Sequence, residues 1–255
     1  MSTAILYVGH GSRVKAGVEE AALFIDHVKR RINKPIQETC FLEFASPSIE
    51  EGIEKCAVQG ATRIVIMPVL LLTAGHALYD IPSKIEKAKE RYPAIEFSYG
   101  NTLGVHDKMA ESVHDRIQEK NTDSLGNDMV LLIGRGSKNP SVKHDMEEIK
   151  RRLLDIYQYQ HVELAFMYGV QPDIWQGFLK AKQSEYDRVL VLPYLLFSGV
   201  LLDTLKKKVE EFTSPAQAFV LCETLGYHPF IRDVLVERVD EAANKMSVQG
   251  TCPSF

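Results

Sequence analysis

Residues 5–12, ILYVGHGS, form a short apolar run that ends in a glycine–histidine–glycine turn. It returns later in the chain as residues 130–137, VLLIGRGS. A second stretch, residues 64–71 (IVIMPVLL), returns as residues 189–196 (VLVLPYLL) at the same spacing of 125 residues. Two such pairs, in the same order and at one spacing, predict that the chain consists of two homologous lobes.

Short apolar segments alternate with segments of helical periodicity in both lobes. Residues 4–8 and 63–69 are apolar runs of strand length, and residues 18–32 carry apolar side chains at intervals of three and four. Strands that alternate with helices favour a mainly parallel sheet that is covered on both faces. We therefore expect an α/β fold of two lobes, each with a four-stranded, mainly parallel sheet flanked by helices, and an active cleft between the lobes.

The repeat also sets the expected boundaries. Residues 1–120 form the N-terminal lobe, residues 121–128 a polar linker, residues 129–245 the C-terminal lobe and residues 246–255 a tail. Within the first lobe the expected strands are residues 4–8, 39–44, 63–69 and 95–99. The expected helices are residues 18–32, 47–59, 82–91 and 106–117.

The composition is typical of a soluble globular protein, with 255 residues of which 45% are hydrophobic and 25% charged. The net charge of -4 argues against general nucleic-acid binding, and no apolar run has the length of a membrane span. The N-terminus lacks the features of a secretory signal, so we expect a cytoplasmic protein. Because one chain already pairs two lobes, we expect a monomer.

Two histidines of the first lobe follow expected strands. His10 lies between two glycines after residues 4–8, and His76 lies beyond the end of residues 63–69. The carboxyl ends of parallel strands share one edge of a sheet, so both side chains should lie on the same rim. Glu43, near the end of another expected strand, adds a carboxylate. Two histidines and one glutamate form a ligand set that suits a first-row metal ion.

The second lobe does not repeat these three residues. The matching positions hold Arg135 for His10, Met167 or Tyr168 for Glu43, and Val200 or Leu201 for His76. A histidine that is purely structural would more often persist in both copies. The asymmetry therefore favours a functional role and a single active centre, in the N-terminal lobe.

Two other histidines do persist, because residues 101–106 (NTLGVH) return as residues 223–228 (ETLGYH). By the same reasoning, His106 and His228 are expected to be structural.

Three basic residues flank the loops that should face each other. Arg135 can bind a substrate carboxylate through two parallel hydrogen bonds. Arg13 flanks the His10 loop of the first lobe, and Lys138 flanks the Arg135 loop of the second. We expect these three residues to contact carboxylates of an acidic substrate. Ordinary solvated side chains are the alternative that the sequence leaves open.

Several common catalytic motifs are absent. The sequence has no G-x-x-x-x-G-K-[ST] loop for a nucleoside triphosphate and no G-x-S-x-G nucleophile elbow, and the G-x-G-x-x-G pattern fails after Gly11. The four cysteines have no C-x-x-C spacing, which argues against a zinc or redox motif. The R-H-G loop of histidine phosphatases remains a distant alternative, because Gly9 stands where those enzymes need an arginine.

Three motifs together resemble the class II chelatases of the CbiX/SirB type, and within them most closely the sirohydrochlorin ferrochelatases. They are residues 8–13 (VGHGSR), 43–47 (EFASP) and 68–76 (PVLLLTAGH), and the resemblance covers essentially the whole chain. It implies ATP-independent insertion of Fe²⁺ into sirohydrochlorin, which gives sirohaem and releases two protons. It also implies that His10 and His76 bind metal or take pyrrole protons, that Glu43 assists, and that the metal is a substrate rather than a permanent cofactor.

Two alternatives remain open beside iron insertion. Close relatives insert Co²⁺ on the way to cobalamin, although the lack of a histidine-rich tail after Glu241 favours iron. A non-catalytic carrier of metal or tetrapyrrole would use the same residues. In either case residues 70–72 and 195–197 are candidates to line a wide apolar cleft, with packing in the core as the other reading.

Overall fold

Two α/β lobes make up the structure, a computed structural model that describes residues 2–120 and 128–244. The first lobe contains β1 (Thr3–Gly9), α1 (Lys15–Lys29), β2 (Ile36–Phe41), α2 (Ile49–Val58), β3 (Arg63–Val69), η1 (His76–Asp80), α3 (Ile81–Arg91), β4 (Glu96–Tyr99) and α4 (Asp107–Gln118). The second contains β5 (Asp128–Gly134), α5 (Pro140–Asp155), β6 (Val162–Phe166), α6 (Ile174–Lys182), β7 (Arg188–Tyr194), α7 (Val200–Phe212), β8 (Ala218–Leu221) and α8 (Pro229–Asn244). The expected tail and all of the expected linker except Asp128 lie outside the described residues.

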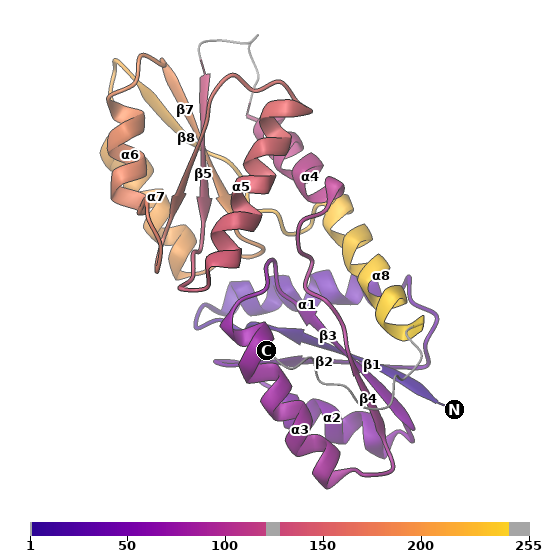
Figure 1. The fold of residues 1–255 in the computed structure, drawn as a ribbon. Coiled ribbons are helices and arrows are strands. Elements are labelled where there is room, and N and C mark those ends of the chain that lie inside the picture. The colour runs from indigo at the N-terminus through magenta and orange to yellow at the C-terminus, as the bar shows by residue number, and fades with distance from the viewer. Residues whose placement is uncertain (1, 121–127, 245–255) are drawn as a thin grey trace.

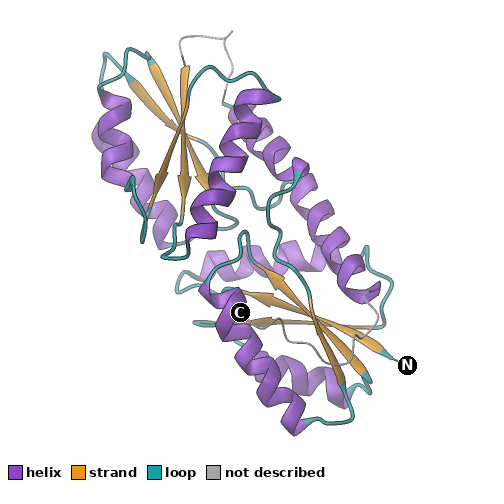
Figure 2. Cartoon of the chain, in the orientation of Figure 1, coloured by secondary structure: helices purple, strands orange, loops and turns teal. Residues whose placement is uncertain are grey.

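Each lobe has one four-stranded sheet, and all neighbouring strands are parallel. The strand orders are β2-β1-β3-β4 and β6-β5-β7-β8, so the topology is the same in both lobes. Helices cover both faces of each sheet (Figure 2), and for this reason the central strands are apolar along nearly their whole length. The predicted α/β fold of two homologous lobes is confirmed.

The strand expected at residues 39–44 is displaced. β2 spans Ile36–Phe41 and is an edge strand, where the half-buried Gln37 and Glu38 are tolerated; their polarity concealed the start of the strand. Past its end, the backbone N–H of Glu43 still donates to the carbonyl of His10 at 3.1 Å. Glu43 therefore lies in a loop beyond the strand rather than within it.

The last helix of each lobe packs against the other lobe. α4 follows β4 of the first lobe but contacts α5 and β7, whereas α8 follows β8 of the second lobe but contacts α1, β3 and β4. The two helices also contact each other between the lobes (Figure 1). As a result, one hydrophobic core contains buried residues of both lobes, such as Tyr7 of β1 and Leu132 of β5. The repeat predicts two lobes but not this exchange of helices.

Two histidines join the exchanged helices. His106 caps α4 by accepting from the backbone N–H of Lys108 at 3.1 Å, and its Nε2 lies 3.1 Å from Oε2 of Glu237 on α8. In the reciprocal position, Nε2 of His228 lies 3.2 Å from Oδ2 of Asp115 on α4. These contacts support the expectation that His106 and His228 are structural.

Hydrogen bonds across the lobes fix their relative position beside the loops that end β3 and β7. Glu20 of α1 accepts from both the backbone N–H and the hydroxyl of Ser198, each at 2.7 Å. The hydroxyl of Ser141 on α5 donates to the carbonyl of Thr73 at 3.3 Å. Gly17 makes the first contact possible, because a Cβ there would lie 2.1 Å from the carbonyl oxygen of Ser198. The two sheets thus present their carboxyl ends to each other in a defined geometry.

Candidate active site

An open cleft of about 570 Å³ lies between the lobes, at the carboxyl ends of both sheets. Loops after β1, β2 and β3 line it from the first lobe, and loops after β5, β6 and β7 line it from the second. Residues 70–72 and 195–197 all lie in its wall, so the expected apolar lining is present. An apolar cleft of this size with a few charged groups is typical of a ligand-binding site.

His10 is held by the turn that follows β1. Its Nδ1 lies 3.0 Å from the carbonyl oxygen of Gly11, and because a carbonyl can only accept, Nδ1 carries the proton and Nε2 keeps a free lone pair. Gly11 has a φ of +89°, and a Cβ there would lie 1.7 Å from the carbonyl oxygen of Glu43. Glycine alone allows this approach, which places the His10 loop against the Glu43 loop.

His76 opens η1, a five-residue π-helical turn directly before α3. Its Nδ1 donates to Oδ2 of Asp80 at 2.7 Å, since the four-residue separation puts both side chains on one face of the turn. His76 is therefore also left with a free lone pair on Nε2. Metal-binding histidines usually donate their other ring N–H to a carboxylate or carbonyl in this way, which fixes the tautomer and the orientation of the ring.

Asp80 is a candidate functional residue that the sequence reasoning missed. An acidic residue four positions after a candidate metal-binding histidine was the available signal.

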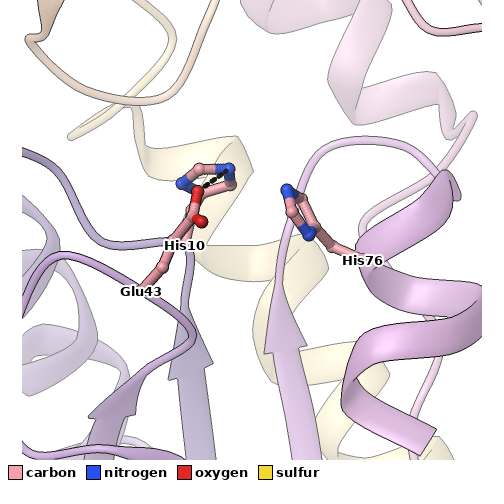
Figure 3. Close-up of side chains that lie close together, drawn as sticks. All are labelled: His10, Glu43 and His76. Carbon is pink, nitrogen blue, oxygen red and sulfur yellow. Dashed lines mark ion pairs between the residues drawn. The ribbon is translucent and has the colours of Figure 1, made fainter.

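The three expected metal ligands come together on the first lobe (Figure 3). Nε2 of His10 lies 3.5 Å from Oε1 of Glu43, and the rings of His10 and His76 stand nearly perpendicular, at 82°, with centroids 4.8 Å apart. One ligand atom from each residue can be chosen so that all three lie within 4.8 Å of one another. Two ligands with bonds of about 2.1 Å can stand up to about 4.2 Å apart, so small inward movements bring all three onto one ion.

The surroundings of His10 favour its neutral form. Burial of the side chain lowers the pKa of His10 below its ordinary value of 6.5; the nearby His76 and Arg135 act in the same direction, while the Gly11 carbonyl and Glu43 oppose them. The Nε2 atom is buried and has no hydrogen-bond partner among the residues that the structure describes. A neutral imidazole with an unsatisfied lone pair is suited to bind a metal ion or to accept a proton.

The second lobe offers different groups at the matching positions. The backbone N–H of Tyr168 donates to the carbonyl of Arg135 at 3.0 Å, which is the same contact that Glu43 makes with His10. Tyr168, and not Met167, is therefore the counterpart of Glu43. Arg135 and Tyr168 both line the cleft, so the second lobe faces the three expected ligands with a guanidinium and a phenol.

The three expected basic contacts differ in position. Arg13 and Arg135 line the cleft, but Lys138 lies with Lys143 and His144 on a separate depression. Lys138 is therefore not among the residues that line the cleft, and a contact between Lys138 and the substrate stays a prediction. The loop before α5 packs closely on the backbone of Gly169, where a Cβ would lie 3.1 Å from the nitrogen of Lys138, and this packing holds the lysine at the other depression.

Comparison with known proteins decides the family. The CbiX family model matches residues 4–120 and then matches again over residues 129–242. The chain belongs to the CbiX family. The double match follows the internal repeat and confirms the resemblance that the motifs at residues 8–13, 43–47 and 68–76 indicate.

Known relatives and a solved structure also match this CbiX-family chain over nearly its whole length. A sirohydrochlorin ferrochelatase of Priestia megaterium is 46% identical over 92% of this chain and 89% of its own length. A sirohydrochlorin cobaltochelatase of the same organism is 37% identical over 93% of this chain and 79% of its own length. The structure of SirB from Bacillus subtilis with Fe³⁺ superposes with a TM-score of 0.88 at 37% identity, covering 96% of each chain. Across residues 2–120 and 128–244, no helix is both long and apolar enough to cross a membrane.

Proposed function

We propose that this CbiX-family protein is a sirohydrochlorin ferrochelatase, which inserts Fe²⁺ into sirohydrochlorin without a nucleoside triphosphate. The observation that carries this proposal is the convergence of His10, Glu43 and His76 on one wall of an apolar cleft. The similarity to a ferrochelatase over 92% of the chain supports the same reaction.

The reaction replaces two pyrrole N–H protons of the macrocycle by one divalent metal ion. The protein must hold the ion without trapping it and must supply proton acceptors near neutral pH. The free Nε2 atoms of His10 and His76 serve either purpose, and the Glu43 carboxylate adds negative charge that favours both the metal ion and a transferred proton. Because the second lobe presents an arginine and a tyrosine instead of further ligands, the ion remains exchangeable.

The acidic periphery of the substrate accounts for the basic residues of the cleft. Sirohydrochlorin carries carboxylate side chains, and a guanidinium binds a carboxylate through paired hydrogen bonds. Arg135 and Arg13 face the cleft from opposite lobes, so together they can orient the macrocycle above the three ligands. We propose this role for the two arginines and not for Lys138.

Cobalt insertion is the second candidate function. A cobaltochelatase is 37% identical to this chain, and a set of two histidines and one glutamate binds Co²⁺ at least as strongly as Fe²⁺ by the general order of divalent affinities. The choice of metal therefore depends on measured rates with each ion.

One chain contains all three ligands and both walls of the cleft, so we propose that the monomer is the functional unit. A cytoplasmic location stays a prediction.

The test is anaerobic absorbance spectroscopy of sirohydrochlorin with the purified protein and either Fe²⁺ or Co²⁺. No ATP is added, and the substrate is in large excess over the protein. Conversion of many equivalents, faster than in a control without protein, is the expected result, and the ratio of the two rates identifies the preferred metal. Spectral changes that stop at one equivalent would identify a carrier and overturn the proposed enzyme.

A further inference from the structure

Phe44, directly after Glu43, is an aromatic residue at a position where neither the backbone conformation nor the packing favours a large side chain. Its φ is +59°, in the left-handed region that a bulky residue rarely adopts. Its side chain is 53% exposed, so the ring buries only part of its apolar surface in return. The exposed ring contributes to the wall of the cleft.

The repeat supplies an internal control for this position. Because Glu43 and Tyr168 make the same backbone contact, the residues that follow them, Phe44 and Gly169, correspond. Gly169 has a φ of +75°, which is unstrained for glycine. The second lobe thus has the residue that this backbone favours, whereas the first lobe has a strained aromatic residue. Strained residues concentrate at functional sites, which indicates that the ring of Phe44 serves binding rather than folding.

A neighbouring cation lies over the ring. Cζ of Arg13 lies 4.7 Å from the centroid of the Phe44 ring, within the range of a cation–π interaction. The repeat pairs Arg13 with Lys138 and Phe44 with Gly169, so the second lobe lacks both the ring and the arginine. There the lysine lies on a separate depression, whereas Arg13 lies in the cleft.

We propose, resting on the function proposed above, that Phe44 is a substrate-binding residue. Its ring packs against the face of the tetrapyrrole and holds Arg13 in position for a peripheral carboxylate of the same molecule. An aromatic ring and a flat macrocycle both present large π-surfaces that pack favourably in an offset arrangement, and a guanidinium held against one of them needs little further ordering to bind the carboxylate.

The experiment compares Phe44→Ala, Phe44→Gly and Phe44→Tyr with the unsubstituted protein. Sirohydrochlorin is titrated without metal and followed by absorbance, Co²⁺ binding is measured without sirohydrochlorin, and steady-state rates and melting temperatures are recorded. The Ala and Gly variants are expected to bind sirohydrochlorin about tenfold more weakly and to show a matching rise in KM. The Tyr variant keeps most of the affinity, and Co²⁺ binding does not change in any of the three.

Stability separates binding from folding in this set. The Gly variant relieves the backbone strain, so it should melt at or above the temperature of the Ala variant although both lose the ring. Tyr227 is the matched control, because it is also a partly exposed aromatic residue at positive φ, +66°, but it lies outside the cleft wall. Tyr227→Gly should leave the affinity for sirohydrochlorin unchanged.

A double-mutant cycle tests the link to Arg13. Arg13→Ala should weaken sirohydrochlorin binding in the unsubstituted protein but have a smaller effect in the Phe44→Ala background. Unchanged sirohydrochlorin binding in both Phe44→Ala and Phe44→Gly would overturn the inference, as would a parallel loss of Co²⁺ binding, which would mean that Phe44 only positions Glu43. Failure of the proposed function is distinct, since the unsubstituted protein would then show no turnover.

Discussion

The two lobes share one sheet topology but carry different chemical groups. Gly11 and Gly136 both adopt a left-handed φ, at +89° and +81°, and each lets its loop approach the loop that follows the neighbouring edge strand. Directly before these matching glycines, the first lobe carries His10 and the second carries Arg135. The comparison separates what the fold requires, which persists in both copies, from what the site requires, which is found in one.

The largest expected effect comes from removing the asymmetric histidines. His10→Ala and His76→Ala should each lower the rate of metal insertion by at least about 100-fold, because each removes a metal ligand or proton acceptor. Circular dichroism and melting temperature should remain close to those of the unsubstituted protein, since both side chains lie at the cleft and not in the core. A fully active His10→Ala variant would contradict the assignment of the active centre to the first lobe.

Asp80 tests the difference between the lobes at the second histidine, because its contact with His76 is made within the first lobe. Asp80→Asn replaces the carboxylate that orients His76 and should lower Co²⁺ affinity by about 10- to 100-fold. The matched control is Asp203→Asn, which changes an acid in the first turn of α7 and should leave Co²⁺ binding unaltered. Isothermal titration calorimetry measures both; equal affinities for the two variants would refute a positioning role for Asp80.

The basic residues allow a test within the second lobe. Arg135→Ala removes a cation that lines the cleft and should raise KM for sirohydrochlorin about tenfold, with a smaller change in kcat. Lys138→Ala removes a cation of the separate depression and should leave KM unchanged. If steady-state kinetics give the same KM for both variants, the proposal that Arg135 binds the substrate and Lys138 does not is wrong.

The smallest expected effect concerns the histidines that both lobes share. His228→Ala removes a buried partner of Asp115 and should lower the free energy of unfolding by about 1 kcal/mol, with the catalytic rate preserved. His106→Ala should have an effect of similar sign, through loss of the α4 cap. Urea unfolding measures the stability, and a selective loss of activity without loss of stability would show that these histidines have a catalytic role.

The sequence was sufficient to predict the repeat, the α/β class and the cluster of His10, Glu43 and His76. These follow from patterns that are local or that recur at a fixed spacing. The displacement of β2 was not predictable from its polarity, because the position of a strand at the edge of a sheet is set by its neighbour. The side on which Lys138 lies depends on packing against Gly169, which is distant in the sequence.

The exchange of α4 and α8 was also beyond the sequence patterns. Both helices are amphipathic segments that would cover either sheet equally well by periodicity alone. The contacts that decide the outcome, such as His106 with Glu237, join residues more than a hundred positions apart. Only the tertiary structure contains this information.

The exchange of α4 and α8 affects how the protein folds while it is being synthesised on the ribosome. The face of β3 and β4 that α8 covers stays exposed until α8 has been made. At ordinary rates of synthesis, the interval between completion of α4 and completion of α8 is roughly 6 to 25 s. During that time the nascent first lobe presents an apolar sheet surface to the cell, so the binding of general chaperones to this half of the chain should be strongest before α8 emerges from the exit tunnel.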